Sequence, residues 1–141
     1  MTTWDIKSGT LYHVTTTKTS LEFPSNITTI ADGTQTESPF SSCRSIVKEI
    51  KFAQGSPITY IGQFCFANTI TLTKADLSNC KALQQLSVGL FFNSSVSEVL
   101  LPEDGKITSF AAGSFARSKI KELIVPNSFK QHLIQMMKVT H

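Results

Sequence analysis

The chain has 141 residues, of which 40% are hydrophobic, and 13 basic and 10 acidic side chains give it a formal net charge of +3. This length suits one domain, which can bury a core without disulfides or metals. The mild charge argues against a nucleic-acid-binding protein, since only two residues, Arg44 and Arg117, are arginines. No apolar run approaches the roughly 20 residues that span a bilayer, so membrane insertion is not expected.

The first residues, MTTWDIKSGT, lack the basic-then-apolar design of a secretory signal, so the sequence alone indicates a cytoplasmic protein. Two segments of apolar–polar alternation follow, TLYHV at 10–14 and SLEFP at 20–24. Alternation with a period of two predicts strands. We expect these segments to pair as a hairpin over the turn TTTKT, with Trp4 and Ile6 sealing that end. Residues 1–19 are therefore predicted to form an N-terminal cap.

A repeat occupies residues 20–126. Two apolar residues separated by one polar residue recur, and the second member of each pair is Phe23, Phe52, Leu77, Leu101 or Val125. The spacings are 29, 25, 24 and 24 residues. The longer first interval contains the polar run DGTQTESP, which we expect to form a bulged loop. Three further apolar columns keep the same period: Ile27, Ile58, Leu83 and Ile107; Ile30, Ile61, Leu86 and Phe110; Phe40, Phe66, Phe91 and Phe115.

The period predicts a stacked architecture. Each pair predicts a short strand, and Pro24, Pro102 and Pro126 end three of these strands because proline cannot donate to a ladder. One unit alone cannot bury its apolar side, whereas stacked units share a continuous core. We therefore expect a right-handed repeat solenoid with one parallel β-sheet of about five short strands and a turn-rich opposite side. A period of 24 falls within the leucine-rich-repeat range of about 20–29.

The motifs resemble a known family. VSEVLLP (96–102), KITSF (106–110), GSFARS (113–118) and IKELIVP (120–126) follow the pattern L-x-x-I-x-I-P, V-x-x-I-G and A-F-x-x-C. This pattern resembles the BspA-type leucine-rich repeat of bacterial and protozoan proteins. The resemblance implies a leucine-rich-repeat fold with surface display, adhesion or partner binding. It also implies a cell-surface or secreted location, and the repeat itself assigns no chemistry.

The chain closes with a predicted cap at 127–141, completing a single domain over 1–141. Phe129, Leu133, Met136 and Met137 recur at helical spacing, and Ser128 is a suitable helix N-cap. We expect a short amphipathic helix that covers the last repeat, followed by a tail. A peptide-binding or membrane-binding helix is the alternative, although two lysines are few for a membrane face.

The residues do not indicate an enzyme. Cys43, Cys65 and Cys80 are odd in number, form no CxxC pair, and fall at or beside packed positions of the repeat, where thiols are inert. His132 and His141 lie in the predicted cap and tail, and no metal-ligand spacing or phosphate loop occurs. We therefore predict no catalytic residue, no cofactor and no metal.

The outward face of the predicted sheet carries the candidate site. One column reads Ser20, Glu49, Lys74, Glu98 and Glu122, and its neighbour reads Glu22, Lys51, Asp76, Leu100 and Ile124. Opposite charges on neighbouring strands are expected to stabilise the register by roughly 0.2–1 kcal/mol per pair. At the end of the sheet, Leu100 and Ile124 form an apolar spot with an acidic border, which is typical of a contact site. The candidate partner-binding residues are Glu49, Lys51, Lys74, Asp76, Glu98, Leu100, Glu122 and Ile124.

The sequence thus predicts a non-enzymatic protein-interaction or adhesion module that binds through its sheet face. The partner is expected to be a protein, either a host protein or a second copy, with a glycan as a further option. The Leu100/Ile124 spot has three candidate occupants: a partner, a second copy that forms a homodimer, or the chain's own C-terminal tail. A self-associating scaffold remains the alternative, and an enzyme with an unrecognised site is the remote one.

Overall fold

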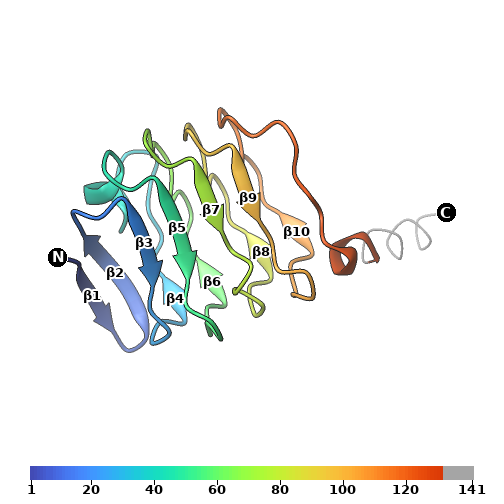
Figure 1. The fold of residues 1–141 in the computed structure, drawn as a ribbon, viewed down its shortest axis with the longest axis horizontal. Coiled ribbons are helices and arrows are strands. Elements are labelled where there is room, and N and C mark those ends of the chain that lie inside the picture. Colours follow the sequence, from blue (N-terminus) through green and yellow to red (C-terminus); the bar gives the residue numbers. More distant parts are fainter. Residues whose placement is uncertain (132–141) are drawn as a thin grey trace.

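The computed structural model describes residues 1–131, which coil into a β-solenoid of stacked turns (Figure 1). The predicted strands form a parallel ladder in the order β3-β5-β7-β9. Their bounds are β3 (Ser20–Phe23), β5 (Glu49–Phe52), β7 (Lys74–Asp76) and β9 (Glu98–Leu100). The pairing follows the predicted columns: Leu21 with Ile50, Ile50 with Ala75, and Ala75 with Val99. The repeat and its register are therefore confirmed for four turns.

The predicted fifth strand, around Leu123 and Val125, is wrong. Residues 120–126 have no strand conformation, although Leu123 and Val125 pack partly buried against the core. The amide of Lys119 still donates to the carbonyl of Val96, at 3.0 Å. Within residues 1–131, this segment has a neighbouring turn on one side only. Its partly buried apolar side chains hold it against the core in place of ladder hydrogen bonds.

The opposite side of the solenoid, predicted to be rich in turns, also carries short parallel strands. There β4 (Thr29–Ile30) pairs with β6 (Tyr60–Ile61), and β8 (Gln85–Leu86) pairs with β10 (Ser109–Phe110). These are the apolar columns of Ile30 with Ile61 and of Leu86 with Phe110. The core lies between these short strands and the main ladder.

The N-terminal hairpin forms from different segments than predicted. Strand β1 (Thr3–Lys7) pairs antiparallel with β2 (Thr10–Thr15), and β2 continues in parallel to β4, whereas β3 lies in the other sheet. The connecting residues Ser8 and Gly9 both have positive φ, 51° and 80°, as the favoured two-residue hairpin turn requires. The prediction that Trp4 and Ile6 seal this end is confirmed, because both pack partly buried against the core and the Trp4 ring lies 5.5 Å from that of Phe23.

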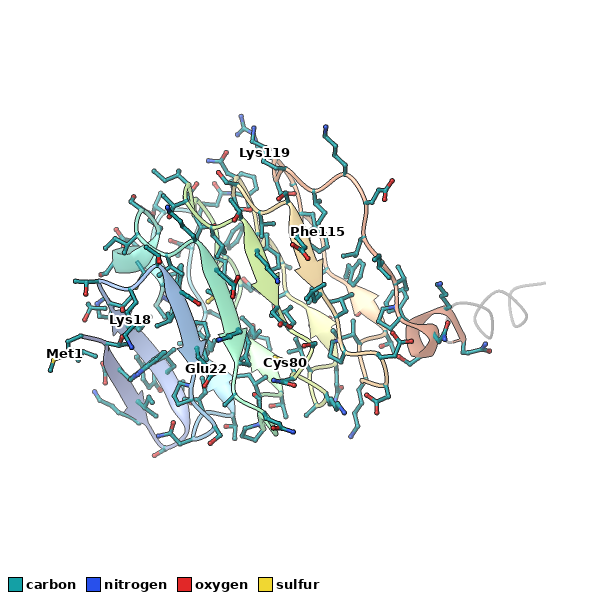
Figure 2. The ribbon with its side chains drawn as sticks, in the orientation of Figure 1. Met1, Lys18, Glu22, Cys80, Phe115 and Lys119 are labelled. Atoms are coloured by element: carbon teal, nitrogen blue, oxygen red, sulfur yellow. The ribbon has the colours of Figure 1, made fainter. Side chains whose placement is uncertain are left out.

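Aromatic side chains run through the core as stacks along the solenoid axis. The ring centroids of Phe66 and Phe91 are 5.7 Å apart at 16°, and those of Phe91 and Phe115 are 5.7 Å apart at 12°. Figure 2 labels Phe115 in the last of these turns. On the main ladder, Phe23 stacks on Phe52 at 4.7 Å. Each ring thus offers a flat surface on which the ring of the next turn packs. This stacking requires the repeat period to stay constant.

The longer first interval does form a loop, as predicted, and the loop is fastened to the following turn. The amide of Gly33 donates to the carbonyl of Gln63 at 2.8 Å, and the hydroxyl of Ser38 donates to the carbonyl of Cys65 at 2.7 Å. Gly62 makes this close approach feasible, since a Cβ there would lie 2.2 Å from the Ala31 carbonyl oxygen. A short 3-10 helix, η1 (Ser41–Cys43), follows the loop.

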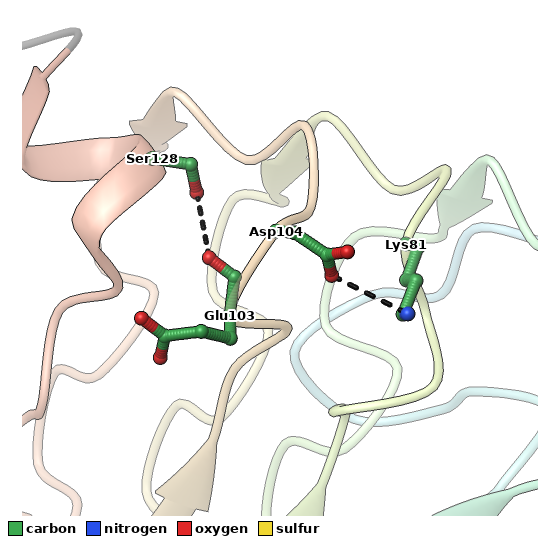
Figure 3. Close-up of polar contacts among 4 residues, drawn as sticks. All are labelled: Lys81, Glu103, Asp104 and Ser128. Carbon is green, nitrogen blue, oxygen red and sulfur yellow. Dashed lines mark hydrogen bonds and ion pairs between the residues drawn. The ribbon is translucent and has the colours of Figure 1, made fainter.

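The chain becomes helical at 127–131, where the predicted cap begins. Phe129 is buried, and its ring stacks on Phe110 at 5.1 Å. Ser128 is not the N-cap that was predicted, because it lies within the helix and its hydroxyl donates to the Glu103 carbonyl at 3.2 Å (Figure 3). Leu133, Met136 and Met137 lie outside the described residues.

We expect Phe91→Ala to lower the free energy of unfolding by about 3–5 kcal/mol, because it leaves a cavity between two stacked rings. Phe92→Ala, at the half-buried neighbouring position, is the matched control and should cost clearly less. Urea denaturation followed by circular dichroism measures both. Equal losses for the two variants would contradict the assignment of Phe91 to the stack.

Candidate protein-interaction surface

The main ladder presents two columns of side chains to its outer face. Glu22 pairs in register with Lys51, Lys51 with Asp76, and Asp76 with Leu100. In the other column Glu49 pairs with Lys74, and Lys74 with Glu98. All these side chains are exposed or half-buried, so the outward assignment is confirmed. Figure 2 labels Glu22 at the start of this face.

Six of the eight predicted contact residues therefore lie together on neighbouring strands. Glu122 and Ile124 are exposed too, but they follow the last strand in the segment 120–126, which has no ladder bonds. The structure places these two residues beyond the edge of β9. Of the two residues of the predicted apolar spot, Leu100 is half-buried on the sheet, and Ile124, outside the ladder, is 79% exposed.

The expected ladder of direct ion pairs is absent from the face. Among residues 1–131, the ion pair within 4.0 Å joins Lys81 to Asp104 at 3.4 Å, on the turns at one edge (Figure 3). Asp76 accepts hydrogen bonds from the amide and hydroxyl of Ser78, at 2.9 and 2.5 Å. The Asp76 carboxylate is therefore used by the turn that follows β7. The ammonium group of Lys51, on the adjacent strand, is free to bind water or a ligand.

Two lysines that the sequence analysis missed also border the apolar spot. A shallow hollow of about 490 Å³ is lined by Ser97, Lys119, Lys121, Glu122 and Ile124. Neither Lys119 nor Lys121 flanks a member of an apolar pair, because both precede the last pair, so the alternation within strands does not reveal them. The border of the spot is thus mixed in charge rather than acidic.

The thiols and histidines were the candidates for nucleophilic chemistry. Cys43, Cys65 and Cys80 are free and buried, as predicted, and burial raises the pKa of each thiol above its ordinary value. Such thiols stay protonated near neutral pH and are poor nucleophiles. His132 and His141 lie outside the described residues.

A serine and a histidine do meet on the surface. The Oγ of Ser42 lies 3.2 Å from Nε2 of His13, and both residues are exposed. Asp5 faces His13 across the β1–β2 ladder, but no ion pair within 4.0 Å joins them in the described part of the chain. Without a carboxylate to orient the imidazole, this contact lacks the third member of a catalytic triad.

No group of three or more His, Cys, Asp or Glu side chains in 1–131 is arranged to hold a metal ion. Within the same range, no helix is long and apolar enough to cross a membrane.

The repeat geometry agrees with a comparison against known families. A profile described as BspA type Leucine rich repeat region matches residues 5–135 in six copies. The chain therefore belongs to the BspA-type leucine-rich repeat family, which confirms the resemblance of the motifs and indicates a protein-interaction repeat module. Comparison with curated proteins and with solved structures gave no match.

Because the three thiols are buried, the free energy of unfolding should fall as the pH becomes alkaline. The unfolded chain ionises its thiols near the ordinary pKa of 9.0, whereas the folded chain keeps them protonated to higher pH. Below about pH 9 the thiols are protonated in both states and stability does not depend on them. Between about pH 9 and the raised pKa of each folded thiol, the free energy of unfolding should fall by about 1.4 kcal/mol per pH unit for each thiol. Urea denaturation between neutral and alkaline pH measures the slope. Cys65→Ala should make the slope shallower, and an unchanged slope would contradict the assignment.

Proposed function

We propose that this chain is a non-enzymatic protein-interaction module, and that the outer face of the β3-β5-β7-β9 ladder, with the Leu100/Ile124 spot, is its contact surface. The proposal depends on the side chains that this surface exposes. The exposed Ile124 lies beside lysines and a glutamate, and these charged groups form no ion pairs with one another within 4.0 Å among the described residues.

The ladder leaves only side chains available for recognition across most of the face. Backbone groups of β5 and β7 are used on both sides by neighbouring strands, so a partner cannot add a strand there. Side chains repeat about every 4.8 Å from strand to strand and form a flat, regular surface. A central apolar contact surrounded by polar and charged groups is the usual anatomy of a protein–protein interface.

Membership of the family bears on where the protein acts and what it binds. The motifs are those of a leucine-rich repeat associated with surface display, and we extend the proposal to adhesion at the cell surface, with a host protein as partner. A homodimer formed through the Leu100/Ile124 spot is the alternative use of the same surface. Biotinylation of intact cells tests the location, and protection of the protein from the reagent would contradict surface display.

Photo-cross-linking tests the contact surface. Leu100 is replaced by p-benzoylphenylalanine in the full chain, which is then irradiated on intact cells. We expect an adduct with another protein, whereas an adduct of twice the chain mass would indicate the homodimer. Gln85, exposed on the opposite side, is the matched control position. Adducts of equal yield at both positions, or none at Leu100, would contradict the proposed face.

Substitution of Ile124 gives a second test. Ile124→Asp should weaken association at least about tenfold, since burying its side chain at an interface contributes roughly 1.5–3 kcal/mol. The thermal midpoint should hardly change, because the side chain is 79% exposed. Sedimentation velocity measures self-association, and the yield of the adduct reports on a foreign partner. Unfolding of the variant would show that Ile124 belongs to the core.

A further inference from the structure

A second surface, separate from the sheet face, lies along the edge of the solenoid where the chain turns back towards the main ladder. A hollow of about 610 Å³ crosses four successive turns there. Both arginines of the chain, Arg44 and Arg117, line it, although 73 positions separate them in the sequence. Between them the lining includes Ile70 and Phe92. We call this hollow the arginine groove.

The period places these four side chains in consecutive turns. Arg44 follows the core residue Phe40 by four positions, and Ile70 follows Phe66 by the same interval. Phe92 and Arg117 follow Phe91 and Phe115 by one and two positions, so they lie in the next two turns but earlier within each turn. The groove therefore reads cation, apolar, apolar, cation along the solenoid axis. Lys119, labelled in Figure 2, lies on the same loop as Arg117.

Hydrogen bonds between turns make the groove wall rigid. The side-chain amide of Asn93 donates to the side-chain oxygen of Asn68 at 2.9 Å, and the amide of Asn68 donates to the Gln35 carbonyl. Asn68, Asn93 and Arg117 have positive φ values of 59°, 54° and 59°, so the three turns share one shape. Arg117 thus holds the position at which a third asparagine would continue the amide ladder.

The charge of the groove is one-sided. Its lining contains two guanidinium groups and no carboxylate. Nη1 of Arg44 donates to the Thr36 carbonyl at 3.0 Å, which fixes that side chain at one end. Arg117 is exposed and makes no ion pair within 4.0 Å in residues 1–131. Ile70, which also lines the groove, is 63% exposed, so the groove includes an apolar surface that a ligand can cover.

We propose that the arginine groove binds an extended acidic peptide of a partner protein, in the pattern acidic–x–apolar–x–acidic. Three steps of about 4.8 Å separate the turns that carry Arg44 and Arg117 by roughly 14 Å along the solenoid axis. In an extended peptide, residues i and i+4 are about 13 Å apart and point to the same side, as does residue i+2. The two carboxylates then meet Arg44 and Arg117, and the central apolar side chain covers Ile70 and Phe92. Arginine suits this role because its planar group binds carboxylates through paired hydrogen bonds.

The test uses a fluorescein-labelled peptide, GTETLTETG, and the full chain, with binding measured by fluorescence anisotropy. One matched control, GTQTLTQTG, removes the charges, and a second, GTTEELTTG, keeps the composition but changes the spacing. We expect the first peptide to bind about tenfold more tightly than either control at low ionic strength, because only its two carboxylates are spaced to pair with both arginines. The advantage should shrink when salt is raised to about 1 M, where screening acts over about 3 Å.

Variants of the chain locate the site. Arg44→Gln and Arg117→Gln should each weaken binding of GTETLTETG about threefold to fivefold, as expected for the loss of one exposed ion pair. Ile70→Thr should weaken the binding of all three peptides, since it removes the apolar contact that they share. Ile124→Asp, on the other surface, should leave the affinity unchanged. Thermal melts confirm that each variant is folded.

Several outcomes would overturn the inference: equal affinity for the glutamate and glutamine peptides, equal affinity for the two glutamate spacings, or no effect of the arginine substitutions. Loss of binding in Ile124→Asp would move the site to the sheet face. The result is independent of the proposed function of that face, because cross-linking at Leu100 and peptide binding at Arg117 are read separately.

Discussion

Everything in this molecule depends on the bonding of each turn to the same position of the turn before it. The amide of Thr28 donates to the carbonyl of Gly9, and the amide of Thr59 donates to the carbonyl of Thr28. The amide of Thr73 likewise donates to the carbonyl of Lys48. Because these bonds join equivalent positions, each side chain lies above its counterpart one period earlier. A column is therefore the physical unit of this fold, and a change in period displaces every column together.

Inner and outer columns obey different constraints. Inner columns must be apolar and close-packed, and the Phe66–Phe91–Phe115 stack shows how strongly one shape is repeated. Ala75, between Ile50 and Val99, shows that one smaller member is tolerated without loss of the strand. Outer columns face water and are free to vary in charge. Recognition can therefore change along the face and along the arginine groove while the core stays the same.

The described ends of the solenoid are less regular because a terminal turn has only one neighbour. At the front, β1 and β2 fold over the first turn, and Trp4 covers Phe23. Towards the other end, residues 120–126 keep their apolar contacts but leave the ladder, and Phe129 covers Phe110. The segment that leaves the ladder carries the exposed Ile124, so an end effect contributes to the candidate contact surface.

The sequence by itself determined the period, the buried columns and the outward face, since a period of two within each strand and about 24 between strands leaves little freedom for residues such as Leu77 or Lys51. The tertiary structure alone decided the features that depend on the direction of turns. It paired β2 with β1 rather than with β3, because the Ser8–Gly9 turn reverses the chain sooner than the longer segment could. It directed Asp76 to Ser78, and it brought Arg44 and Arg117 to one groove, because the path of each turn sets where its polar side chains end and no linear pattern records that path.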